Sequence, residues 1–127
     1  MATIKSYTDI EQSRKLTDIL PLESADMIYL KREINDTFIE TPIVKPIGNV
    51  EKSLCCWSLA ALLDVLPKIC YPVKDHPTYL ILGKPKDKWC ALYWDTTGMQ
   101  DGEQTLADNP VDACVAMIEK LNELKML

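Results

Sequence analysis

The stretch LCCWSLAALLDVL (residues 54–66) is the longest apolar run of the chain, and it decides the predicted fold. Its length and its alanine and leucine content favour a helix over a strand. Pro67 directly follows and ends the helix, because proline lacks the N–H that the next helical hydrogen bond needs. Apolar residues surround this helix on nearly every side, so we expect it to be buried at the centre of the molecule.

A second helix and a hairpin are predicted before this central helix. Thr8 and Glu11 have the spacing of a capping box, and Pro21 ends the helix that they begin. The segments MIYLK (27–31) and TFIET (37–41) follow as two strands. A short polar turn joins them, so the pattern predicts a first β-hairpin.

A second hairpin is predicted after the central helix. The segments TYLIL (78–82) and WCALYW (89–94) are continuously apolar, which is typical of strands covered on both faces. Residues 83–88 form the connecting loop.

The C-terminal helix has the clearest start signal of the chain. Asn109 can cap it, Pro110 takes the first helical position, and Asp112 places negative charge at the positive end of the helix dipole. Its buried stripe is predicted to comprise Val111, Cys114, Val115, Met117, Ile118, Leu121 and Leu124. The element order is therefore αββαββα. The sequence predicts a single α+β domain over residues 1–127, with mainly antiparallel sheets packed around the buried central helix.

Two tetrapeptides repeat in this order. DILP (18–21) and DVLP (64–67) each close a predicted helix and precede a predicted hairpin. Duplication of an αββ unit would explain the repetition, and a pseudo-two-fold axis would then relate the two units. A chance match of so few residues is the alternative.

The composition is that of one globular domain with an acidic balance. The chain has 127 residues, 47% hydrophobic and 26% charged, and a formal net charge of −5. This balance opposes binding to nucleic acid, whose partners usually present a basic face. The basic cluster of Lys84, Lys86 and Lys88 has no aromatic residues interleaved, so a solvated turn is the favoured interpretation. No apolar run reaches the ~20 residues that cross a bilayer, so no membrane span is expected.

The cysteines indicate a reducing compartment. Their number is five, which is odd, and they lie mostly in apolar segments, where cysteine acts as a small hydrophobic residue. The N-terminus has no apolar stretch of signal-peptide length. We therefore predict a cytoplasmic protein with reduced, mostly buried thiols. These are Cys55, Cys56, Cys70, Cys90 and Cys114.

The most specific catalytic hypothesis is a cysteine hydrolase site formed by Cys56, His76 and Asp95. Papain-like hydrolases place a nucleophilic cysteine at the start of a buried helix, where the dipole lowers the thiol pKa, and add a histidine base with an orienting Asp or Asn. Here Cys56 and Trp57 open the predicted central helix and look like the cysteine-tryptophan pair of those enzymes, while His76 precedes one strand and Asp95 follows the next. The spacing from Cys56 to His76 is tight, and no nearby glutamine precedes Cys55 as an oxyanion donor. A packed cysteine and a loop histidine are the favoured interpretation.

No metal or cofactor site is predicted. Zinc sites use paired ligands such as Cys-x-x-Cys, whereas this chain has a vicinal Cys55-Cys56 pair and one histidine. The acidic loop after residue 94 lacks the EF-hand residues at Met99 and Gln100, so a solvated loop is favoured over a calcium site. Its acidic residues are Asp95, Asp101, Glu103 and Asp108.

Aromatic residues concentrate near the most hydrophobic segments. Trp57, Trp89 and Trp94, with Tyr79 and Tyr93, fit a packed core. The alternative is that one or two of the tryptophans are exposed and form a protein-binding patch.

Three segments follow one another in the order ESADM (23–27), WSLAALLDVLP (57–67) and DNPVDA (108–113). Through these segments the chain resembles a group of small uncharacterised proteins of gut bacteria and their prophages. The resemblance extends from about Tyr7 to Leu121. It implies a shared fold and a phage or mobile-element context, with no activity, substrate or cofactor. Members of that group need not carry a cysteine beside the tryptophan matching Trp57, which weighs against chemistry at Cys56.

The sequence favours a non-catalytic accessory or protein-interaction domain, because every catalytic pattern is incomplete whereas the fold signals agree with one another. We expect a protein partner rather than nucleic acid or a membrane. One alternative is a small papain-like cysteine hydrolase that uses Cys56, His76 and Asp95. A second is an acidic inhibitor of a host enzyme, motivated by the net charge of −5.

Overall fold

The computed structural model describes residues 5–34, 37–45, 54–73, 76–94 and 101–127, with side chains except at 31–34, 37–40, 70–73, 76 and 101. The helices in these ranges are α1 (Ile10–Thr17), the 3-10 helix η1 (Leu22–Ser24), α2 (Leu59–Val65) and α3 (Pro110–Glu123). The strands are β1 (Met27–Ile34), β2 (Thr37–Val44), β3 (Leu54–Cys56), β4 (Ile69–Val73), β5 (His76–Gly83), β6 (Trp89–Trp94) and β7 (Asp101–Ala107).

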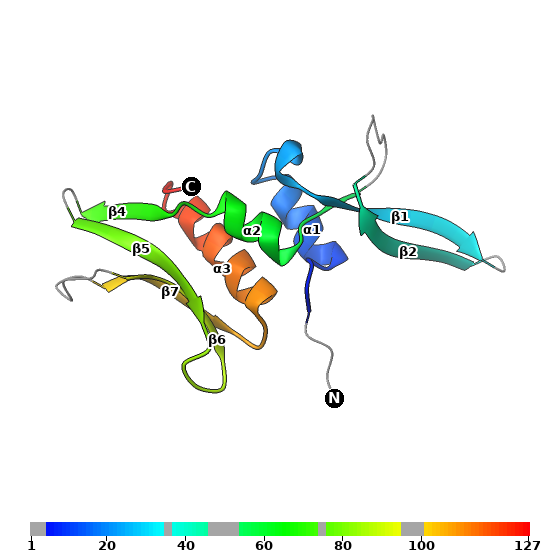
Figure 1. The fold of residues 1–127 in the computed structure, drawn as a ribbon. Helices are drawn as coiled ribbons and strands as arrows, with labels where there is room; N and C mark the ends of the chain where they lie inside the picture. The colour runs from blue at the N-terminus through cyan, green and yellow to red at the C-terminus, as the bar shows by residue number, and fades with distance from the viewer. Residues whose placement is uncertain (1–4, 35–36, 46–53, 74–75, 95–100) are drawn as a thin grey trace.

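These elements form the α+β fold that the sequence predicts. Strands β2, β1 and β3 make a three-stranded sheet, and β4, β5, β6 and β7 make a four-stranded sheet in that order. All the described strand pairs are antiparallel. Figure 1 shows the helices gathered between the two sheets, with the β1–β2 hairpin extending away from them. Helix α3 packs on β6, β7 and α2, so it covers one face of the four-stranded sheet.

A hydrophobic core joins the helices to this sheet. The predicted stripe of α3 is buried, except that Leu124 caps the helix C-terminus and is exposed. Asn109 caps α3 and Pro110 begins it, as predicted. None of the described helices has the length and hydropathy that a membrane span requires.

The central helix is shorter than predicted. Residues 59–65 are helical, whereas Leu54–Cys56 form β3 along the free edge of β1. The helix starts late because the Ser58 side chain accepts a hydrogen bond from the Ala61 N–H and caps it. Leu62 is fully buried at the centre, as expected, but Asp64 and Ala60 are exposed, so the helix is not enclosed on every side.

The cap of α1 lies one residue later than predicted. The Asp9 carboxylate accepts a hydrogen bond from the Gln12 N–H at 2.8 Å. In return, the Gln12 side-chain oxygen accepts one from the Asp9 N–H at 3.1 Å. The predicted cap residue, Thr8, is instead fully buried. Its N–H donates to the Trp57 carbonyl at 2.9 Å, and its hydroxyl accepts from the Trp57 N–H at 3.1 Å. These bonds fasten the start of α1 to the start of α2.

Both predicted hairpins are confirmed, but three described strands lie outside the predicted order. β3 falls within the stretch predicted as the central helix, β4 contains Pro72, and β7 has the polar sequence DGEQTLA. Neither proline nor a polar run signals a strand. These additions also give the two sheets unrelated strand orders, since β1 is flanked by later strands and β5 by an earlier and a later one. The strand orders therefore give no support to the predicted duplication of an αββ unit.

An ion-pair cluster joins the N-termini of α1 and α3. Lys5 Nζ lies 3.0 Å from Asp9 Oδ2 and 2.8 Å from Asp112 Oδ1, and Gln12 Nε2 donates to Asp112 at 2.7 Å. Burial alone would lower the pKa of Lys5, but hydrogen bonds and the charges of Asp112 and Asp9 outweigh burial and raise it. Each carboxylate also lies at the positive end of a helix dipole, so the cluster holds the two helix ends together.

We expect Gly102→Ala to destabilise the fold. Gly102 lies where the β6–β7 register shifts. A Cβ added to Gly102 would lie 2.8 Å from the carbonyl carbon of Tyr93 and 2.9 Å from the Cβ of Tyr93. One strand would have to move, so the free energy of unfolding should fall by about 1–3 kcal/mol, measured by chemical denaturation. Gly83→Ala is the matched control, because a Cβ at that strand residue meets nothing within 4 Å. Equal losses in the two variants would contradict the close approach.

Candidate functional site

Cys56 does not lie at the start of a helix. It is the last residue of β3 and pairs with Met27 of β1. Ser58 occupies the helix-start position, and its N–H donates to Asp26 Oδ1 at 2.9 Å. A strand therefore positions the Cys56 thiol, which differs from the arrangement that the hydrolase hypothesis requires.

The Cys56 thiol is fully buried in a small polar cluster. It donates to the Thr8 carbonyl oxygen at 3.4 Å, and the Thr8 hydroxyl donates to the sulfur at 3.6 Å. The Ser13 hydroxyl lies 2.8 Å from that of Thr8, and the Tyr29 hydroxyl donates to the Thr8 carbonyl at 2.5 Å. Burial raises the pKa of the Cys56 thiol, and the hydrogen bonds offset this only in part. The environment thus favours the neutral thiol over the nucleophilic thiolate.

The backbone separates Cys56 from His76. Cys56 ends a strand of the three-stranded sheet, whereas His76 begins β5 of the four-stranded sheet. The prediction of a loop histidine is therefore wrong, because residue 76 pairs with Val73 of β4. Figure 1 shows helices α2 and α3 between the start of β5 and the start of β1, with which Cys56 pairs. The His76 side chain and the whole of Asp95 lie outside the described residues. The described backbone places the nucleophile and the base of the hydrolase hypothesis in different sheets.

The described cysteines and carboxylates form no metal site. In the part of the chain that the structure describes, no three His, Cys, Asp or Glu side chains converge. Of the residues predicted to form a solvated acidic loop, Asp101 and Glu103 lie instead in β7. Glu103 pairs with Lys120 at 3.0 Å, and Asp108 pairs with Lys88. The cysteines with described side chains are free and buried, as predicted, and they are Cys55, Cys56, Cys90 and Cys114.

The three tryptophans lie in different environments. Trp57 is fully buried, and its indole N–H donates to Ser24 Oγ at 2.9 Å. Trp89 is half-buried and packs against the core. Trp94 is 47% exposed, although it is large and apolar. The protein-binding alternative therefore concerns Trp94 and its neighbours.

Trp94 belongs to an apolar face of the four-stranded sheet that no described element covers. The prediction that β5 and β6 are buried on both faces is wrong, because α3 and α2 cover only the side that carries Ala91 and Tyr93 (Figure 1). We call the opposite side the outer face. Its exposed large side chains are Ile69, Tyr79, Ile81, Trp94 and Leu106.

Strand register arranges the outer face in three rows across the sheet. The first row is Ile69, Tyr79 and Trp94; the second is Ile81, Leu92 and Gln104; the third is Gly83, Cys90 and Leu106. None of these nine positions carries a charged side chain, although charged residues make up 26% of the chain. Asp101 pairs with Trp94 beyond the register shift of β7, and its side chain lies outside the described part of the structure. The rows also differ in size. Aromatic rings lie in the first row, whereas Gly83 and the buried Cys90 lie beside Leu106 in the third.

The β5–β6 loop leaves two hollows at the third row. One, of about 320 Å³, is lined by Ile81, Gly83, Lys84, Pro85, Cys90 and Leu92. The other, of about 530 Å³, is lined by Pro85, Lys86, Asp87, Lys88, Gln104 and Leu106. Within the described residues, neither Lys84 nor Lys86 forms an ion pair. Each hollow thus has apolar residues and one such lysine in its lining, and Asp87 also lines the second.

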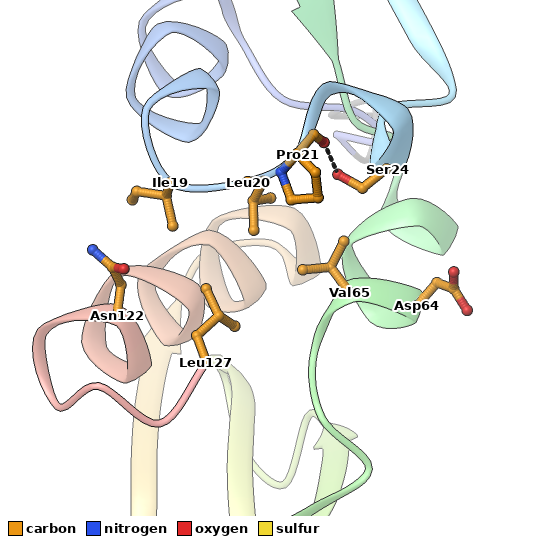
Figure 2. A pocket seen from close by; sticks show the side chains of 8 residues that line it. All are labelled: Ile19, Leu20, Pro21, Ser24, Asp64, Val65, Asn122 and Leu127. Carbon is orange, nitrogen blue, oxygen red and sulfur yellow. Dashed lines mark hydrogen bonds between the residues drawn. The ribbon is translucent and has the colours of Figure 1, made fainter.

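A separate pocket lies where the DILP and DVLP segments meet. It measures about 440 Å³ and is lined by Ile19, Leu20, Pro21, Ser24, Asp64, Val65, Asn122 and Leu127. Figure 2 shows Ile19 and Leu20 pointing toward α3, while the Asp64 carboxylate points away from the other side chains. The Ser24 hydroxyl donates to the Pro21 carbonyl at 2.6 Å, so it is already engaged. This pocket has apolar walls but no base or nucleophile directed into it.

No protein-family model, curated protein or solved structure matches the chain. Function must therefore be inferred from the residues and surfaces described above.

The sequence does not reveal the outer face directly, because two continuous apolar segments predict strands buried on both sides. One signal points to it. The sequence predicts only three helices, and the C-terminal helix has a single apolar stripe, so it can cover only one face of the second hairpin.

We expect iodoacetamide to alkylate Cys56 slowly in the folded protein near neutral pH. The thiol is buried and its pKa is raised, so little thiolate reaches the reagent. Mass spectrometry of alkylated peptides measures the rate, and His76→Ala should not change it. The control is protein in denaturant, where Cys56 should react at the rate of a free thiol. Rapid labelling that is confined to Cys56 and lost in His76→Ala would instead support the hydrolase alternative.

We also expect stability to fall at alkaline pH, in part through Cys114. Burial raises the pKa of this thiol to about 11, whereas the ordinary value for a cysteine is 9.0. Between these values the unfolded chain loses a proton that the folded chain keeps, so folding stability drops as pH rises, by up to about 1 kcal/mol per pH unit. Urea denaturation from pH 7 to 11 measures the slope. Cys114→Ala should be less stable at pH 7 but lose stability less steeply, and equal slopes would contradict this role.

Proposed function

We propose that the protein is a non-catalytic protein-interaction domain whose docking surface is the outer face of the β4–β7 sheet. The observation that carries this proposal is the set of five exposed large apolar side chains that share this face, Ile69, Tyr79, Ile81, Trp94 and Leu106. A monomer in water gains nothing from this exposure, and contiguous apolar surface of this kind marks contact sites. The resemblance to proteins of gut bacteria and their prophages supports a phage or mobile-element context, and the free thiols support a cytoplasmic location.

The surroundings of Cys56 also favour binding over catalysis. A hydrolase needs an accessible thiolate beside a base, whereas Cys56 is buried among hydroxyl and carbonyl groups. The outer face has the opposite character, since Trp94 and Leu106 are 47% and 58% exposed. Aromatic residues are the typical anchors of protein interfaces, and charged residues are depleted at the centre of such interfaces.

Photocrosslinking tests the docking surface. A benzophenone amino acid in place of Ile81 should give one discrete adduct in cells that contain the native protein, because Ile81 lies within the outer face. The same replacement at the exposed Glu123 of α3 is the matched control and should give none. Trp94→Lys combined with Leu106→Lys should abolish the Ile81 adduct. Absence of a discrete adduct from Ile81, or an adduct that survives the double substitution, would refute the proposal.

Neighbouring residues provide the folding control for this experiment. Trp94→Ala should change the free energy of unfolding by less than about 1 kcal/mol, because half of its side chain is already in water. Tyr93→Ala should cost about 3–5 kcal/mol, because Tyr93 is buried and its hydroxyl donates to the Pro67 carbonyl at 2.6 Å. Similar losses at both positions would mean that the outer face stabilises the fold, which would exclude it as a free docking surface.

A further inference from the structure

We infer that the outer face binds a second copy of this chain, sheet against sheet. This inference rests on the proposed function, because it names the partner of the same surface. Two such sheets stack about 10 Å apart when both contribute an apolar face. The two copies would be related by a two-fold axis that lies between the sheets and runs across their strands.

The size gradient of the outer face selects this axis. Rotation about a line across the strands keeps each strand over its own copy and reverses its direction. The first row of one copy then lies over the third row of the other, so Tyr79 faces Gly83 and Trp94 faces Cys90. Large rings thus oppose Gly83, above which the space is open, and Cys90, which is itself only 4% exposed; the large residue of that row is Leu106. An axis along the strands would instead place the first row of one copy over the first row of the other. The third row would then face the third row, and no ring would fill the hollow there.

The hollow at the third row fits this arrangement. Its volume is about 320 Å³, and Gly83 and Cys90 form part of its wall. A Cβ at Gly83 would meet no atom within 4 Å, so the space above this residue is open in the single chain. An aromatic ring from the other copy can occupy this space without displacing any described atom of the backbone.

The loop lysines provide matching electrostatics. Lys84 borders the hollow that would receive the partner ring, and Lys86 borders the adjacent one. Both lysines are exposed, and ammonium groups within about 6 Å of an aromatic ring are attracted to its face. The loop therefore offers favourable contacts to Tyr79 and Trp94 of a second copy, at the end of the sheet where the two-fold axis brings them.

The small area of the outer face implies that the dimer is weak. Four strands about 4.8 Å apart and the six residues of β6 at about 3.4 Å each give a face of roughly 20 by 20 Å, or about 400 Å². A standard protein interface buries about 800 Å² on each partner, and smaller ones are weak and transient. The dimer should therefore be weak and transient.

Sedimentation velocity on the full chain, from about 1 to about 300 µM, tests this inference. We expect a reversible monomer–dimer equilibrium and a blue shift of Trp94 fluorescence as the dimer forms. Gly83→Leu should weaken the dimer about tenfold or more by filling the hollow, and Tyr79→Ala should weaken it by removing the ring. The double variant should be weakened by less than the product of the two single effects, since the introduced leucine of one copy would then face the introduced alanine of the other. Leu22→Ala is the control, because Leu22 is exposed outside the outer face, and it should have no effect.

The outcomes separate this inference from the function on which it rests. A chain that stays monomeric at all concentrations, with an Ile81 adduct to a different protein, would refute the second copy and leave the docking surface intact. A dimer that Gly83→Leu does not weaken would refute this face and axis. Lack of both a dimer and an adduct would overturn both proposals.

Discussion

The burial of Trp57 is the constraint on which the arrangement of the helices depends. Its ring is enclosed in the core, and its indole N–H, backbone N–H and carbonyl each have a hydrogen-bond partner, supplied by Ser24 and Thr8. Residue 57 lies between the end of β3 and the cap of α2, so these bonds connect α1, η1, β3 and α2 at one point. Leaving any of these polar groups buried without a partner would cost about 1–3 kcal/mol. The side chain of Cys56 is thereby directed to the Thr8 cluster, and its buried thiol is a consequence of the packing around Trp57.

Helices that gather around one tryptophan cover only one side of the four-stranded sheet. Helix α3 fills the inner face, where Ala91 and Tyr93 are buried, and it lies against α2. The chain then has no further described helix for the other side. An outer face built from Tyr79, Ile81 and Trp94 is therefore an outcome of the architecture, and its apolar composition is what requires a functional explanation.

Local chemistry made the start of α3 and the two hairpins predictable. Asn109 and Pro110 specify the start of α3 through a side-chain cap and a fixed φ angle, and both are found where the sequence places them. Predictions failed where distant contacts decide the outcome. Leu54–Cys56 have apolar side chains that suit a helix, but the free edge of β1 offers backbone hydrogen bonds that no local pattern reveals. Thr8 resembles a cap, yet its hydroxyl is used by Trp57, and Asp9 replaces it. The sequence leaves the exposure of Trp94 open because burial depends on which face the helices cover.

The variation of side-chain size along the outer face restricts the orientation in which a partner can bind, which hydrophobicity alone would not do. A uniform apolar face could pack against another surface in many orientations, and it would promote aggregation rather than a defined contact. Here the rings of Tyr79 and Trp94 lie at one end of the sheet, while Gly83 and Cys90 lie at the other, beside the lysines of the β5–β6 loop. Size and charge therefore vary in the same direction along the strands. Only an antiparallel stacking of two such faces places rings over gaps and lysines over rings at both ends at once, so the surface that attracts a second copy also restricts how that copy can bind.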